Sequence, residues 1–82
     1  MILVDVYVPS VDKEYDFSLN ETVTVQTIIE EIAEMIGQKE QTFLVGNIED
    51  MNLCDKESGT ILPYNGTLSN CGIRTGASLI LI

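Results

Sequence analysis

Two cysteines and thirteen acidic residues are the side chains best suited to chemistry, because the 82-residue chain contains no histidine. Without an imidazole, neither a Ser-His nor a Cys-His nucleophilic pair can form. Cys54 and Cys71 are too far apart in the sequence for a Cys-x-x-Cys redox or zinc motif. One disulfide could form in an oxidising compartment, but the sequence shows no export signal, so we predict two reduced thiols, with Cys71 packed in a turn as a small apolar side chain. No enzymatic activity and no cofactor are expected.

The acidic residues have a simpler explanation than metal binding. Glu30, Glu31 and Glu34 lie on the polar side of an amphipathic segment, where carboxylates are usually solvated. Residues 50–55 lack the alternating oxygen ligands, the glycine and the terminal glutamate of a calcium loop. The glycines near the C-terminal end are not followed by a lysine in a strand-to-helix context, as a phosphate cradle requires. The sequence therefore predicts no metal or phosphate site.

The charge balance is strongly acidic, with thirteen Asp and Glu against four Lys and Arg and a net charge of −9. Nucleic acids and anionic lipids attract basic proteins, so this charge argues against both and favours a basic protein partner. The opening stretch MILVDVYV lacks the basic region and the small-residue cleavage site of a signal peptide. No apolar run approaches the roughly 18 residues of a membrane span. We therefore expect a cytoplasmic protein that does not insert into a membrane.

The beginning of the chain predicts a hairpin. Apolar residues occupy every second position of residues 2–8, which is the period of a strand with one buried face. The stretch PSVDKE supplies turn chemistry, and the alternation resumes over residues 15–19. Two antiparallel strands joined by a turn follow from this pattern.

A helix is predicted over residues 25–36, because apolar residues recur there with the helical period of 3.6 and glutamates fill the opposite side. Thr24 precedes the helix as an N-cap, whose hydroxyl can bond an orphan amide. Gly37 follows it, at the position where a left-handed residue commonly ends a helix. Residues 38–50 give no assignment, since TFLVGN fits either a short strand or a helical turn.

The second half of the chain predicts shorter strands. Residues 51–54 and 60–62 flank DKESG, whose Asp, Ser and Gly can build a tight hairpin connection. In TLSNCGI, Leu68 and Ile73 are expected to point inward from a single helical or 3₁₀ turn. SLILI, residues 78–82, forms the final strand.

The predicted order of elements is strand, strand, helix, strand, strand, turn and strand. The simplest compact arrangement is one domain over residues 1–82 with a mixed sheet, in which the last strand lies parallel beside the first. One main helix packs across one face of this sheet, which gives an α+β β-grasp. In this arrangement Leu79 and Leu81 point towards the helix together with Val4 and Val6.

The stretch TLSNCGIRTGASLILI resembles the end of the YukD/EsaB family, small ubiquitin-like proteins associated with type VII (WXG100) secretion systems. The resemblance rests on the Leu68, Cys71-Gly72-Ile73 and Gly76 pattern, which is followed by an alternating strand. It implies a ubiquitin-like β-grasp fold. It also implies an accessory role, with a cytoplasmic domain of a membrane-embedded subunit, such as the pseudokinase-like one, as partner.

The face of the sheet that points away from the helix, the outer face, is predicted to bind this partner. An outer face is normally polar, yet several apolar side chains are expected here, joined by Met51 or Leu53. Such a patch marks a partner surface, and an acidic rim that includes the helix glutamates would steer a basic partner. The predicted partner-binding residues are Leu3, Asp5, Tyr7, Ile80 and Ile82.

Three alternatives remain open for this surface and for the function. The chain could form a scaffolding homodimer through the outer face, or residues 38–50 could fold back and cover it. A β-grasp carrier or modifier is the third, but such proteins need a flexible Gly-Gly tail that can thread into an adenylating enzyme. The sequence ends in Leu81-Ile82, so we expect a protein that is not conjugated unless such a tail is missing.

Overall fold

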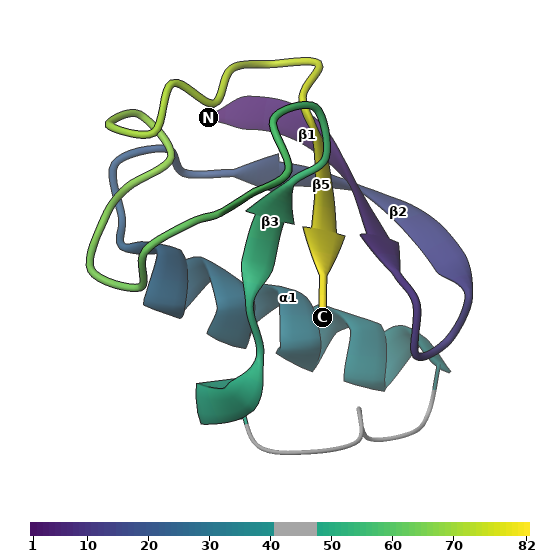
Figure 1. The fold of residues 1–82 in the computed structure, drawn as a ribbon. Coiled ribbons are helices and arrows are strands. Elements are labelled where there is room, and N and C mark those ends of the chain that lie inside the picture. Colours follow the sequence, from purple (N-terminus) through teal and green to yellow (C-terminus); the bar gives the residue numbers. More distant parts are fainter. Residues whose placement is uncertain (41–47) are drawn as a thin grey trace.

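The computed structural model describes residues 1–40 and 48–82, and Figure 1 shows their fold. The order of elements is the predicted one, with a short 3₁₀ helix added before the third strand. The elements are β1 (Ile2–Val8), β2 (Lys13–Leu19), α1 (Val25–Glu40), η1 (Ile48–Asp50), β3 (Leu53–Asp55), β4 (Thr60–Ile61) and β5 (Ser78–Leu81).

The strands form one mixed sheet in the order β2-β1-β5-β3-β4. β5 pairs with β1 in parallel, whereas β1 and β2, β3 and β5, and β3 and β4 pair antiparallel. α1 lies across one face of the sheet (Figure 1). The predicted α+β β-grasp, with a mixed sheet and one main helix packed across it, is confirmed.

The core lies between this face of the sheet and α1. The register places Val6 beside Leu79, and Leu53 beside Leu81, so that inward side chains of neighbouring strands meet. Full burial of each such aliphatic side chain contributes about 1.5–3 kcal/mol to stability. The largest fully buried side chains are Leu19, Ile28, Ile29, Ile32, Ile36, Leu53, Leu68, Leu79, Val6, Val8 and Val25.

The start of α1 is tied to the loop that precedes β5. Thr24 is the N-cap, as predicted, because its Oγ1 accepts a hydrogen bond from the Thr27 amide at 3.3 Å. The next orphan amides find backbone partners in the loop, with Val25 donating to the Gly66 carbonyl at 2.8 Å and Gln26 to the Tyr64 carbonyl at 3.0 Å. This connection fixes the helix against the far end of the chain.

The end of α1 differs from the prediction. The helix continues to Glu40, and Gly37 lies inside it without the positive φ of a left-handed cap. Glycine in a helix costs about 1 kcal/mol relative to alanine, but the residues after Gly37 are good helix formers. Lys39 also places its Nζ 5.3 Å from the centre of the Tyr15 ring, which joins the last turn of α1 to β2.

The boundaries of the later elements shift by one or two residues. β3 begins at Leu53 and β4 ends at Ile61. The DKESG connection is the predicted tight turn, in which Gly59 has a φ of 69° and its amide bonds the Asp55 carbonyl at 2.8 Å. Of the unassigned residues 38–50, the first three belong to α1 and the last three to η1, while TFLVGN lies outside the described residues.

The turn before β5 matches its prediction. The amide of Cys71 bonds the carbonyl of Thr67 at 3.1 Å and closes one helical turn. Leu68 and Ile73 are both buried, and Leu68 has no exposed surface. The turn therefore anchors the loop to the core immediately before the chain enters the centre of the sheet.

Candidate partner-binding surface

The outer face of the sheet carries a row of side chains that runs across its strands. The register places Tyr7 of β1 beside Ile80 of β5, Ile80 beside Cys54 of β3, and Cys54 beside Ile61 of β4. We call these four residues the apolar row. α1 covers the opposite face, so the helix does not bury the row (Figure 1).

The side chains of the apolar row differ in exposure. Ile61 is 57% exposed, Tyr7 and Ile80 are half-buried, and Cys54 is buried between its neighbours in the ladder. Burial raises the pKa of the Cys54 thiol above its ordinary value, because a thiolate is costly where water is excluded. The row therefore presents apolar surface at both ends and a neutral thiol between Ile80 and Ile61.

Ile82 extends the apolar surface beyond the row. It exchanges two backbone hydrogen bonds with Asn52, at 2.6 and 2.9 Å, and its side chain is 57% exposed. The predicted residues Tyr7, Ile80 and Ile82 therefore lie at the same end of the outer face.

The predicted contributions of Met51 and Leu53 to this face are wrong. Leu53 pairs with Leu81, whose side chain points inward, and it has no exposed surface. Met51 is two residues away, shares the inward side and is buried. Cys54, the residue after Leu53, takes the outer position instead, because it pairs with Ile80.

A polar row crosses the outer face next to the apolar row. Asp5 lies beside Ser78 on one side and Asp16 on the other. Hydrogen bonding by the Ser78 side chain lowers the pKa of Asp5, an effect that partial burial opposes and that Glu14 and the charge of Lys56 reinforce. Asp5 is therefore a carboxylate at neutral pH, and its two acidic neighbours on β2 are exposed.

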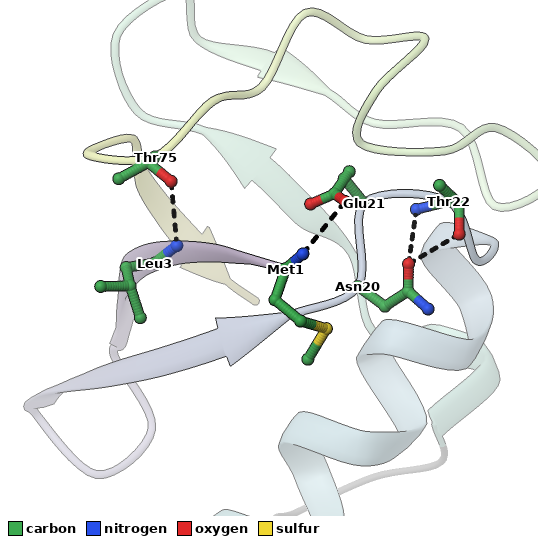
Figure 2. Close-up of polar contacts among 6 residues, drawn as sticks. All are labelled: Met1, Leu3, Asn20, Glu21, Thr22 and Thr75. Carbon is green, nitrogen blue, oxygen red and sulfur yellow. Dashed lines mark hydrogen bonds and ion pairs between the residues drawn. The ribbon is translucent and has the colours of Figure 1, made fainter.

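Leu3 lies on the other side of the polar row from the other predicted apolar residues. It is 62% exposed and four residues before Tyr7, which corresponds to about 13 Å along a strand. Figure 2 shows its backbone amide donating to Thr75 Oγ1, at 3.3 Å, and its side chain pointing away from α1. The same view shows the Met1 amino group 3.2 Å from Glu21 Oε1, which holds the start of β1. The predicted residues share one face but form two apolar ends.

The helix glutamates do not belong to the rim of this surface, contrary to the prediction. Glu30, Glu31 and Glu34 are exposed on α1, which lies on the other side of the sheet. The acidic side chains that do flank the apolar row come from the first hairpin, and they are Asp5, Glu14 and Asp16. Ile61 and Cys54 were missed because the sequence does not fix how β3 and β4 register against β5.

Residues 1–40 and 48–82 contain no group of three or more His, Cys, Asp or Glu that could hold a metal ion. Cys54 and Cys71 are both free thiols. Within the same residues, no helix has the length and the apolar character required to cross a membrane. The feature that stands out is the exposed apolar surface on the sheet.

Comparisons with known proteins agree with the fold. The sequence model of the family described as "WXG100 protein secretion system (Wss), protein YukD" matches residues 3–81, nearly the whole chain. No curated protein matches the chain. The match covers both the first hairpin and the pattern before β5.

Solved structures similar to the chain include ubiquitin-like domains. The N-terminal ubiquitin-like domain of the 4931431F19Rik protein has a TM-score of 0.76 and 23% identity, covering 99% of this chain and 72% of that chain. A designed protein based on human erythrocytic ubiquitin has a TM-score of 0.74 and 26% identity, covering 100% and 90%. The ubiquitin-like domain of Arabidopsis thaliana At2g32350 has a TM-score of 0.73 and 22% identity, covering 99% and 74%.

Proposed function

The chain belongs to the YukD family of the WXG100 protein secretion system, and we propose that it acts there as a non-enzymatic, ubiquitin-like protein-interaction module. The module spans residues 1–82 as one domain, works in the cytoplasm as an accessory component, and acts by non-covalent docking. The observation that carries this proposal is the apolar row together with Ile82. An apolar face that none of the described elements covers, on a small acidic domain, favours a protein partner over a solvated surface.

The partner in this proposal is a cytoplasmic domain of a membrane-embedded subunit of the secretion system, such as its pseudokinase-like subunit. Apolar residues at the centre of an interface supply most of the binding energy, and Tyr is enriched there. Tyr7, Ile80 and Ile82 would form this centre, with Leu3 as a second contact. Asp5 and the net charge of −9 would steer a basic surface into place.

The proposal is tested with Ile80→Glu, which places a charge in the middle of the apolar row. The matched control is Met35→Glu, because Met35 is also an exposed apolar residue, 41% exposed, but lies on α1 at the other side of the molecule. The probes are the purified cytoplasmic domains of the membrane-embedded subunits from the host secretion system. Binding is measured by calorimetry, and folding by circular dichroism and thermal melting.

We expect the wild type and Met35→Glu to bind one of these domains and Ile80→Glu to lose binding while it stays folded. Equal binding by all three folded proteins would reject the outer face as the docking surface. Light scattering over a range of protein concentrations tests the homodimer. A concentration-dependent dimer of the wild type that Ile80→Glu abolishes, without binding to any probe, would replace partner docking by self-association.

A further inference from the structure

Asp12 is the one described residue other than glycine that has a positive φ, with a value of 51°. It ends the turn between β1 and β2, where its amide bonds the carbonyl of Pro9 at 3.1 Å. A left-handed backbone is strained for residues with a Cβ atom; Asn and Asp tolerate it better than other such residues, and Gly adopts it without strain. The turn therefore carries an aspartate where a glycine would be easier to accommodate.

The side chain of Asp12 makes a contact that glycine cannot make. Its Oδ1 accepts a hydrogen bond from the hydroxyl of Tyr7 at 2.7 Å. Tyr7 is the β1 member of the apolar row and the neighbour of Ile80. The bond therefore reaches from the turn to the outer face, and it joins two residues five positions apart in the chain.

We propose that Asp12 is a positioning residue, which holds the Tyr7 ring in the orientation that the outer face presents to its partner. Strained residues other than glycine gather at functional sites, where their strain is retained for a contact. A hydrogen bond at an exposed position adds little to folding stability, since water competes for both groups. The bond therefore fixes one side chain and contributes little to the fold. Its effect on binding rests on the proposed function of the outer face.

The electrostatics of Tyr7 agree with this bond. The hydrogen bond to Asp12, together with partial burial and the negative charge of Asp12, raises the pKa of the Tyr7 phenol above its ordinary value. Glu14 lies directly across the ladder from Tyr7, and Asp5 lies two residues before it on the same face. Both remain unchanged in the variants below, so a change in the titration of Tyr7 reports on Asp12.

Three variants separate positioning from structural support. Asp12→Gly relieves the backbone strain of the positive φ and removes the carboxylate that accepts the Tyr7 hydrogen bond. Asp12→Asn keeps an oxygen acceptor and a side chain that tolerates a positive φ. Tyr7→Phe removes the donor and leaves the turn intact. Each variant is compared with the wild type by thermal melting, by NMR of the ring at position 7 and of the Ile80 methyl groups, and by calorimetry with the cytoplasmic-domain probes.

We expect Asp12→Gly to melt at the wild-type temperature or above it, while Tyr7 titrates closer to the ordinary value of about 10. Free rotation leaves about a third of the rings in the bound rotamer, so binding should weaken about threefold. Tyr7→Phe should weaken binding to the same degree, and adding Asp12→Gly to it should weaken binding no further. Asp12→Asn should bind almost as the wild type does.

Two results would overturn the role of Asp12. If Asp12→Gly leaves the Ile80 methyl signals and the affinity unchanged, the bond does not determine how the Tyr7 ring is oriented on the outer face. If Asp12→Gly lowers the melting temperature and Tyr7→Phe does not alter binding, Asp12 serves the turn alone. Ile80→Glu distinguishes these failures from a failure of the proposed function. If Ile80→Glu loses binding while the Asp12 and Tyr7 variants keep it, the outer face is still the docking surface and only the role of Asp12 is rejected.

Discussion

The inner and outer faces of the sheet are built from alternate residues of the same strands, but they differ in exposure. On the inner face, Val4 and Leu81 are 3% exposed and Leu79 is 1% exposed. On the outer face, Leu3 is 62% and Ile61 57% exposed. Both faces carry large aliphatic residues, so hydrophobicity alone does not decide which side of a strand is buried.

This difference shows that coverage by α1 separates structural residues from candidate binding residues. An apolar residue under the helix stabilises the fold, whereas an apolar residue on the other side is available to another protein. Leu79 and Ile80 are neighbours in β5 and lie on opposite sides of this division. They offer the sharpest comparison between the two faces.

The largest expected effect comes from Leu79→Ala, which removes a buried side chain and leaves a cavity under α1. We expect it to lower the free energy of unfolding by about 2–5 kcal/mol. Ile80→Ala should lower it by about 1 kcal/mol or less, because Ile80 is half-exposed. Urea unfolding measures both values. Equal losses would show that the outer face is buried as deeply as the inner one.

Most of the inner face could be predicted from the sequence, because alternation and helical periodicity each mark one buried side. The first hairpin, the Thr24 cap and the parallel pairing of β5 with β1 were all predicted correctly. In these segments the local pattern and the tertiary fold agree. The helix end was not predicted, since Gly37 carries a capping signal but lies inside the helix, which continues to Glu40.

The outer face could be predicted only in part. Its β1 and β5 members follow from alternation, but the distance between Leu3 and Ile80 depends on how the parallel strands register. β3 is too short to show its own alternation. Whether Leu53 or Cys54 points to the outer face is therefore known only from the pairing of β3 with β5. The role of Asp12 was not predicted, because the sequence marks a turn at residues 9–14 but not which of its residues takes the positive φ or bonds Tyr7.

The two cysteines test how well the middle of the apolar row is shielded from solvent, with an expected effect of intermediate size. Cys54 is buried on the outer side of β3, whereas Cys71 is half-buried in its turn. The raised pKa of Cys54 reduces its thiolate fraction at any pH below that pKa, so its alkylation should begin at a higher pH than that of an ordinary thiol.

We expect a thiol reagent at neutral pH to modify Cys71 well before Cys54, as measured by peptide mass spectrometry. Ile61→Ala and Ile80→Ala should each speed the labelling of Cys54, because these residues flank it in the ladder. Faster labelling of Cys54 in the wild type would mean that the middle of the apolar row is open to solvent.

The smallest expected effect concerns the polar row and its pH dependence. The pKa of Asp5 is lowered in the folded protein, chiefly by the Ser78 side chain. A carboxyl whose folded pKa lies below the unfolded value stabilises the protein above the unfolded pKa of about 3.9, and this stabilisation is lost as the pH falls through the folded pKa. Asp5→Asn should remove that loss.

Melting temperatures of the wild type and Asp5→Asn between neutral pH and the acid range test this effect. The two curves should converge as the pH falls below about 4, because the wild type loses its advantage there. Ser78→Ala should shift the curve in the same direction as Asp5→Asn, but less. A constant difference at all pH values would show that Asp5 is not linked to folding by its charge.

The parallel pairing of β5 with β1 also sets the order in which the chain can assemble. Residues 5–7 pair with residues 78–80, so the centre of the sheet cannot form during synthesis until residues 78–80 have left the ribosome. Until then β1, β2 and α1 can meet, but the inner face lacks Leu79 and Leu81. Closing so long a loop costs conformational entropy, which raises the folding barrier and slows folding. A nascent chain of this protein therefore keeps its inner apolar surface incomplete until β5 has been synthesised, which is the interval in which a chaperone would engage it.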